Sequence, residues 1–291
     1  MKGSSKGVEG TIDKHMELGK RNKMTVVRKV DFGVYLDGGD MGDVLLPKRY
    51  VPRGCEVGDQ VEVFLYLDQE ERMVATTETP LVEVGQFAYL EVAWVNQYGA
   101  FLSWGLMKDL FCPFREQKMR MVQGRKYIVY CYVDDVTHRI VASAKTEKFL
   151  SKQHPEYKSG EEVDILIQQK TDLGFKAIVD GRYSGQIYQN ELFRSIHTGD
   201  RMKAYVKNVR EDGKIDLVLQ GHGQEYVHDF SDRLFDYICR HEGFCKFHDK
   251  SDAEDIYREF QVSKKVFKKA IGDLYKRHLI IIEDNGLRRN S

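Results

Sequence analysis

The sequence predicts a mainly β protein with a small α+β end: three small β-barrels in tandem, followed by a domain of three helices and a hairpin. The first observation is a threefold repeat, in which glycines recur with the same gaps of 14 and 25 residues. The second is a change of hydrophobic period near residue 229, from strand-like alternation to the period of a helix. The length of 291 residues alone suggests about two domains, so the higher count rests on the repeat.

We expect residues 1–16 to form a flexible N-terminal arm, because they carry no hydrophobic pattern, and Met16 is a candidate for the biological start. The repeats then occupy residues 17–80, 81–146 and 147–221. Each is marked by one glycine triplet: Gly19, Gly33 and Gly58; Gly85, Gly99 and Gly124; Gly160, Gly174 and Gly199. A β-rich run precedes each middle glycine, and two further strands follow each third glycine. A glycine within a strand pattern predicts a bulge or a sharp bend, which closure of a small barrel requires.

The last domain, residues 225–288, is predicted to be a winged helix-turn-helix that follows a linker at Gly221-His222-Gly223. Phe230, Leu234, Tyr237 and Ile238 share one helical face, and Ala253, Ile256, Tyr257 and Phe260 share another. Ser263 is a predicted N-cap for a third helix that reaches about Leu279. The following residues are typical of a strand, a tight turn at 284–286 and a short return strand.

Composition excludes several classes of protein. The 45 basic and 45 acidic side chains give a net charge of zero, which argues against a uniformly basic surface. No apolar run approaches the roughly 18 residues of a spanning helix, and no signal-peptide core is present, so we expect neither membrane association nor secretion. The five cysteines include no Cys-x-x-Cys pair and indicate no disulfide framework, which favours the cytoplasm.

Two short motifs carry a family resemblance. Phe32-Gly33-Val34-Tyr35 and Tyr98-Gly99-Ala100-Phe101 resemble the Phe-Gly-Ala-Phe segment of S1-type RNA-binding domains, and residues 185–191 resemble its Gly-Leu-Val-His-Ile-Ser-Glu segment. Asp68 with Arg72, and Asp134 with Arg139, resemble its Asp-to-Arg element. Three such repeats before a winged helix resemble the bacterial conserved virulence factor B family over about residues 17–288.

This resemblance implies three tandem S1-type five-stranded OB barrels, a C-terminal winged helix and RNA binding. The RNA-facing aromatics would be Phe32, Tyr35, Tyr98 and Phe101, and the polar partners would be Asp68, Arg72, Asp134 and Arg139. The motif's histidine is replaced by Pro47, Pro113 and Tyr188 in the three repeats. The third repeat also has Leu173 and Lys176 at the aromatic positions and Lys214 at the arginine position, so it is divergent. Tyr188, with Tyr183 and Lys176, is a candidate substitute there.

Each candidate residue has an ordinary structural alternative. Bases stack on exposed aromatic rings, but two rings three residues apart reach one outer face only if the bend is a bulge; otherwise one ring of each pair fills its barrel. Arg72 and Arg139 either contact RNA or pair with Asp68 and Asp134 as surface salt bridges. Both alternatives remain open at the level of sequence.

The predicted third helix of the last domain has a basic face. Phe267, Ala270, Ile271, Leu274 and His278 share its apolar side, whereas Lys265, Lys268, Lys269 and Lys276 share the opposite side. A basic helix in a helix-turn-helix is a typical nucleic-acid contact, although a lysine run is also an ordinary solvated face.

Nothing in the sequence indicates catalysis. Cys239, His241, Cys245 and His248 lie close together but do not have the usual zinc-ligand spacing, and no nucleophile elbow, phosphate loop or dinucleotide motif occurs. We therefore expect no metal, no cofactor and no small-molecule substrate.

The leading hypothesis is a non-enzymatic, cytoplasmic protein that binds single-stranded RNA and regulates gene expression post-transcriptionally. The alternative is a winged-helix regulator that binds DNA, with the barrels as effector or dimerisation modules. A third, weaker hypothesis is an adaptor whose barrels bind protein.

Overall fold

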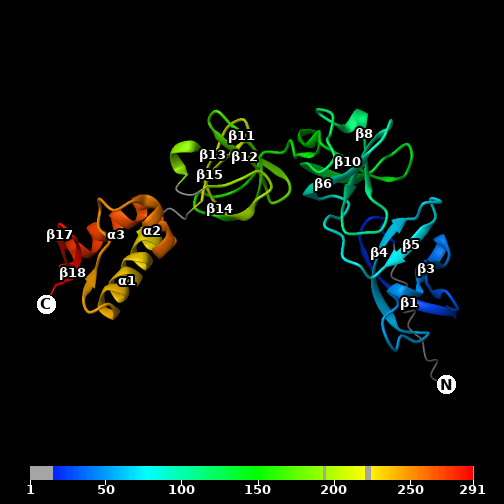
Figure 1. Cartoon of the computed structure of the whole chain (residues 1–291), viewed down its shortest axis with the longest axis horizontal. Coiled ribbons are helices and arrows are strands. Elements are labelled where there is room, and N and C mark those ends of the chain that lie inside the picture. The colour runs from blue at the N-terminus through cyan, green and yellow to red at the C-terminus, as the bar shows by residue number, and fades with distance from the viewer. Residues whose placement is uncertain (1–15, 193–194, 220–223, 291) are drawn as a thin grey trace, which may run out of the picture. The chain divides into compact units, whose positions relative to one another are not determined.

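The structure is a computed structural model that describes residues 16–192, 195–219 and 224–290 (Figure 1). The predicted N-terminal arm up to residue 15 and the glycine-containing linker at 221–223 lie outside these residues. The chain divides into two compact units, Met1–Thr146 and Glu147–Ser291.

Each of the three repeats forms a closed five-stranded barrel, as the sequence predicts, and the strand order is the same in all three. Barrel 1 consists of β1 (Arg21–Val30), β2 (Gly33–Leu36), β3 (Val44–Pro47), β4 (Gln60–Leu67) and β5 (Met73–Thr76). Barrel 2 consists of β6 (Phe87–Val95), β7 (Gly99–Ser103), β8 (Leu110–Pro113), β9 (Lys126–Val133) and β10 (Ile140–Ser143). Barrel 3 consists of β11 (Glu162–Thr171), β12 (Gly174–Val179), β13 (Tyr183–Tyr188), β14 (Arg201–Val209) and β15 (Ile215–Val218).

The middle glycine of each repeat begins the second strand at a point of close backbone approach. A Cβ atom at this glycine would overlap a carbonyl oxygen of the third strand: Gly33 with Leu46, Gly99 with Cys112, and Gly174 with Ile187. The bulge that we expected here lies instead within the preceding strand, between Val26 and Arg28, Val92 and Trp94, and Ile167 and Gln169. The glycine is therefore required by packing of one strand against the next, and the bulge separately bends the first strand.

Barrels 1 and 2 share part of one hydrophobic core. Phe64 and Tyr66 of β4 pack in the same buried cluster as Leu90 and Trp104 of barrel 2, and the Phe64 and Trp104 rings meet edge to face at 5.7 Å. The backbone N–H of Val84 also donates to the carbonyl of Gly19 at 2.8 Å. A shared core of this kind holds the two barrels in a fixed arrangement.

The C-terminal domain is a winged helix, as predicted. Its elements are α1 (Gln224–Arg240), β16 (Phe244–Cys245), α2 (Ala253–Phe260), α3 (Lys264–Lys276), β17 (Ile280–Glu283) and β18 (Gly286–Arg289), and the sheet order is β16-β18-β17. No sequence pattern indicated β16, which is only two residues long. Ser263 caps α3 as expected, because its Oγ accepts the N–H of Val266 at 3.3 Å.

The third helix ends earlier than the predicted Leu279. Arg277 is its C-cap, and His278 adopts a left-handed backbone with φ of 57°. The N–H of Leu279 then bonds to the carbonyl of Leu274 at 3.0 Å, which closes the helix end. His278 is consequently exposed, and the prediction that it shares the buried face with Phe267 was wrong.

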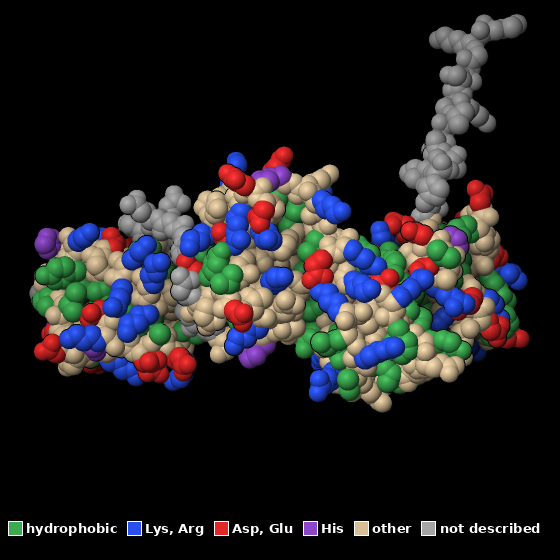
Figure 2. All heavy atoms as spheres, turned by 90° about the horizontal axis from the view of Figure 1, so that it is seen from above, with side chains coloured by type: hydrophobic (Ala, Val, Ile, Leu, Met, Phe, Trp, Pro, Cys, Tyr) green, Lys and Arg blue, Asp and Glu red, His purple; other side chains and the backbone are tan. Residues whose placement is uncertain are grey.

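Among the described residues, no helix combines the length and the apolar composition that crossing a membrane requires. Figure 2 shows Lys and Arg side chains mixed with Asp and Glu on the face seen there, in keeping with the zero net charge.

Candidate nucleic-acid interface

Phe32 and Tyr35 both lie on the outer surface of barrel 1. Val34 and Leu36 of β2 are buried in the barrel, so Tyr35 between them faces outward. Phe32 lies in the turn before β2 and is 58% exposed, and its ring meets that of Tyr35 edge to face at 6.4 Å. The alternative that one ring of the pair fills the barrel was therefore wrong, but the turn rather than a bulge brings the rings to one face.

Barrel 2 has the same pair with additional rings around it. Tyr98 is 65% exposed in the turn before β7, and Phe101 lies on the outer side of β7. The indole of Trp94 stacks on Phe101 with 3.7 Å between ring centroids and 2° between ring planes. Phe111, which lies opposite Phe101 in the β7–β8 register, approaches it from the strand beside it, with centroids 4.9 Å apart. The result is a four-ring wall formed by Trp94, Tyr98, Phe101 and Phe111.

Sequence reasoning missed Trp94 and Phe111. Trp94 follows the bulge of β6, which changes the face on which the following side chains emerge, and it is 42% exposed. The indole N–H donates to Asp109 at 2.9 Å, which fixes the orientation of the ring. Phe111 would have required knowledge of the β7–β8 register, whereas a tryptophan four residues before Tyr98 was a usable signal.

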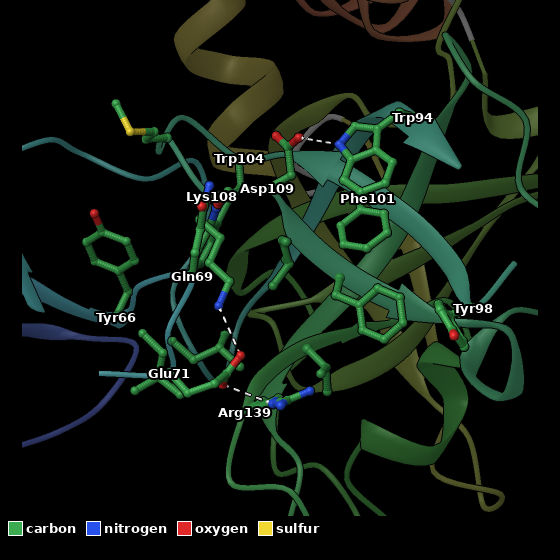
Figure 3. Close-up of a pocket in the computed structure, with 16 residues that line it drawn as sticks. Tyr66, Gln69, Glu71, Trp94, Tyr98, Phe101, Trp104, Lys108, Asp109 and Arg139 are labelled. Carbon is green, nitrogen blue, oxygen red and sulfur yellow. Dashed lines mark hydrogen bonds and ion pairs between the residues drawn. The ribbon is translucent and has the colours of Figure 1, made fainter. Parts of the chain in front are cut away.

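The four-ring wall forms one side of a cavity of about 730 Å³, which we call the inter-barrel cavity (Figure 3). Its other side comes from barrel 1, through Tyr66 and the β4–β5 turn with Gln69 and Glu71. Two cationic side chains of barrel 2, Lys108 and Arg139, also line it. The cavity therefore combines aromatic rings with two cations and two carboxylates, Glu71 and Asp109, and both barrels contribute to it.

Both cations are held by the same carboxylate. Arg139 Nε lies 2.9 Å from Glu71 Oε2, and Lys108 Nζ lies 3.4 Å from Glu71 Oε1. Lys108 Nζ also donates to the backbone carbonyl of Asp68 at 2.7 Å. Figure 3 shows Glu71 between the two cations. These contacts join barrel 2 to the β4–β5 turn of barrel 1.

The first Asp-to-Arg element is an ion pair. Arg72 donates through Nε and Nη2 to Asp68 Oδ2, at 2.9 and 2.8 Å. Partial burial opposes ionisation of Asp68, but hydrogen bonds from the backbone and side chain of Arg72 and from the N–H of Glu70 outweigh it and lower the pKa of the carboxyl. Arg72 is thus engaged within its own turn.

The second Asp-to-Arg element does not pair its side chains, contrary to the salt-bridge alternative. Asp134 binds Arg115, which follows β8, and accepts hydrogen bonds from the N–H groups of Val136 and Thr137. The Thr137 backbone bond is the main reason that the pKa of Asp134 is lowered. Arg139 reaches Glu71 of barrel 1 instead, and the turn from Asp134 to Arg139 is one residue longer than the turn from Asp68 to Arg72.

Barrel 3 lacks the aromatic wall. Leu173, at the position of Tyr98, is 65% exposed. Tyr188 ends β13 and accepts a hydrogen bond from Arg210, whose Nε donates to Asp216 at 2.8 Å. Tyr183 lies at the other end of β13 and packs against Tyr157, with ring centroids 5.8 Å apart. Tyr183 is therefore separated from Tyr188 along β13, whereas Lys176 pairs with Gln186, two residues from Tyr188.

The basic face of α3 is open to solvent. Lys265, Lys268, Lys269 and Lys276 are all exposed, while the opposite face is buried in the domain core. In the described part of the winged helix, the ion pairs of this helix end are those of Arg277 with Asp232 and Asp273, at 2.9 and 3.2 Å. The four lysines form no ion pair with any described residue, so their charge is available.

The cysteine and histidine residues of the last domain do not form a common site. Cys245 is buried, which raises the pKa of its thiol to about 11, whereas His241 Nδ1 lies 2.8 Å from the carbonyl oxygen of Tyr237. Among the described residues, no three His, Cys, Asp or Glu side chains are grouped so as to hold a metal ion.

Comparison with known proteins supports the same domain types. Residues 18–78 match the S1 domain model, and residues 232–288 match the CvfB-like winged helix domain model. Conserved virulence factor B of Staphylococcus aureus is 23% identical over 235 residues, with 78% of each chain covered. The resemblance to the conserved virulence factor B family is thereby confirmed. The matched S1 segment contains Phe32, Tyr35 and the Asp68–Arg72 pair, and the matched winged helix contains the lysines of α3.

Two further proteins are similar over nearly the whole chain. The uncharacterized protein YitL of Bacillus subtilis is 27% identical over 288 residues, with 94% of each chain covered. A crystal structure of a multidomain protein with nucleic acid binding domains from Streptococcus pneumoniae is 21% identical, with a TM-score of 0.41, and covers 94% of this chain and 98% of its own.

Proposed function

We propose that this chain is a non-enzymatic RNA-binding protein that holds single-stranded RNA on barrels 1 and 2 and uses the basic face of α3 for additional phosphate contacts. The observation that carries the proposal is the inter-barrel cavity, where four aromatic rings lie beside two cationic side chains. Base stacking on exposed rings contributes roughly 1–3 kcal/mol per base and tolerates any base. The exposed Phe32–Tyr35 pair of barrel 1 supplies a second stacking surface.

The shape of the interface favours a single strand over a duplex. The bases of a duplex are already stacked on each other, so the exposed ring of Tyr98 would have no base face to contact. Unpaired bases, in contrast, can enter a cavity of about 730 Å³ one or two at a time. The choice of RNA over DNA rests on the resemblance to S1-type domains, because stacking alone does not distinguish the two.

The role of α3 follows from the chemistry of lysine. Lysine ammonium groups are point charges on flexible stems, which suit phosphate contacts rather than bidentate recognition of base edges. The four exposed lysines therefore add affinity without sequence preference. As part of the same proposal, the protein acts in the cytoplasm as a post-transcriptional regulator.

One observation favours a second candidate function, duplex DNA binding by the winged helix. In the winged helix, α3 occupies the usual position of a recognition helix, and its lysines form no ion pair with any described residue. Against this, the face offers no Asn, Gln or Arg side chain to read bases.

A competition titration tests the proposal. Unlabelled single-stranded RNA, single-stranded DNA and duplex DNA of equal length compete for the full chain against one labelled RNA, across about 50–200 mM salt. We expect single-stranded RNA to compete best and affinity to fall as salt rises. Tighter binding of duplex DNA than of single-stranded RNA would refute the proposal and favour the DNA-binding regulator.

A further inference from the structure

In the inter-barrel cavity, the carboxylate of Glu71 lies between two cationic side chains that could instead bind an anion from solution. Lys108 and Arg139 both belong to barrel 2, and both point to Glu71, which barrel 1 contributes through its β4–β5 turn. Glu71 adopts a left-handed backbone with φ of 62° at the tip of this turn, which directs its side chain into the cavity. One carboxylate thus contacts both cations and offsets one of their two positive charges.

We propose that Lys108 and Arg139 form a phosphate subsite in the inter-barrel cavity, which Glu71 occupies until a phosphate of a bound polynucleotide displaces it. This inference rests on the proposed function, because the phosphate is that of the nucleotide whose base stacks on the four-ring wall. A carboxylate and a phosphate present the same kind of acceptor oxygens to arginine and lysine, so one can replace the other without any change in the cations.

The geometry makes this exchange feasible. The side chains of Arg139, Glu71 and Lys108 are 55%, 37% and 34% exposed, so water reaches all three and the pairs are weak enough to open. The two cations are not equivalent. Lys108 is also held by the carbonyl of Asp68, whereas Glu71 is the partner of Arg139 among the described residues. Arg139 is therefore the cation that exchanges Glu71 for the phosphate, and Lys108 keeps its bond to Asp68 and adds charge.

The neighbouring Glu70 provides a matched control. It lies in the same turn, one residue away, but pairs with Arg72 at 3.0 Å and does not line the cavity. Glu70→Gln and Glu71→Gln change the net charge of the chain equally. A difference between the two variants consequently reports the local position of the carboxylate rather than the overall charge.

The experiment measures binding of a labelled single-stranded oligoadenylate of about 16 nucleotides to the full-length protein and its variants. We expect Glu71→Gln to bind roughly three- to ten-fold more tightly than Glu70→Gln, which is the effect of removing two exposed ion pairs that compete with the phosphate. Arg139→Gln should weaken binding, and adding Glu71→Gln to Arg139→Gln should give a much smaller gain than it gives alone.

Two results would overturn the inference while leaving the proposed function intact. One is that Glu71→Gln binds the oligonucleotide no more tightly than Glu70→Gln while the wild type still binds it. Thermal unfolding of each variant then shows whether the contacts of Glu71 instead stabilise the packing of barrel 1 against barrel 2. The other is an undiminished gain in the Arg139→Gln background, which would indicate a long-range charge effect. Absence of binding by the wild type and every variant would overturn both the inference and the proposed function.

Discussion

Replacing Tyr98 with leucine removes one ring from the four-ring wall and introduces the residue that barrel 3 has at the equivalent position. Leu173 of barrel 3 occupies the equivalent position. The carbonyl of Tyr98 accepts the N–H of Phe114 at 3.2 Å, and the carbonyl of Leu173 accepts that of Gln189 at 2.9 Å. Both side chains are 65% exposed. Tyr98→Leu therefore converts this position of barrel 2 into that of barrel 3 with little effect on stability, expected within about 0.5 kcal/mol.

The size of the effect follows from stacking. If one base stacks on Tyr98, removal of the ring should reduce the binding free energy for single-stranded RNA by roughly 1–3 kcal/mol, or about five-fold to 150-fold in Kd. Tyr98→Phe retains the ring and should bind nearly as well as the wild type. Leu173→Ala in barrel 3 should have no effect, because that substitution removes no ring.

Fluorescence anisotropy with labelled single-stranded RNA at fixed salt measures the affinities, and thermal unfolding followed by circular dichroism measures the fold. An unchanged Kd for Tyr98→Leu, with the fold intact, would refute the assignment of this ring to base stacking. An equal reduction in affinity for Tyr98→Phe would show that the hydroxyl rather than the ring is responsible.

Three further predictions concern other parts of the chain. Phe32→Ala should weaken RNA binding by roughly 1–3 kcal/mol without unfolding barrel 1, because the ring is 58% exposed; melting of the barrel with unchanged affinity would contradict this. Changing Lys265, Lys269 and Lys276 to glutamine should weaken binding equally across RNA sequences and make the salt slope shallower by about 0.7 for each phosphate that these lysines no longer neutralise, whereas a sequence-selective effect would indicate base readout. A thiol reagent should modify Cys239 first in the native protein, since the other cysteines are buried; faster reaction at any of these would show that its barrel or domain opens.

The fold could be predicted because close contacts between neighbouring strands require glycine at fixed positions of each repeat. Gly33, Gly99 and Gly174 recur because any side chain there would overlap a carbonyl of the next strand. The hydrophobic alternation of β2, with Val34 and Leu36 buried, likewise follows from local sequence. The end of α3 was misplaced because His278, rather than a glycine, takes the left-handed position after the helix.

The site was predicted only in part, because half of it depends on contacts between distant segments. Tyr98 and Phe101 belong to a recognisable motif. Glu71 and Lys108 do not: they meet only because barrel 1 packs against barrel 2, and no local pattern reports this. The same contact redirects Arg139 away from the predicted partner within its own turn. Sequence patterns thus located the exposed rings of the candidate site but could not assign the charges around them.

The contrast between barrels 2 and 3 indicates which features distinguish the candidate binding site from the shared barrel fold. Both barrels share the same strand order and the same glycine contact, so neither feature distinguishes them. Barrel 2 differs in having aromatic rings at positions 98 and 101. In addition, the β4–β5 turn of barrel 1 lies beside these rings and lines the same cavity. Because barrels 1 and 2 share a hydrophobic core, this cavity is formed before any ligand binds, and the entropic cost of binding is correspondingly smaller. Selection for nucleic-acid binding would therefore act on the packing between these two barrels as well as on the aromatic rings themselves.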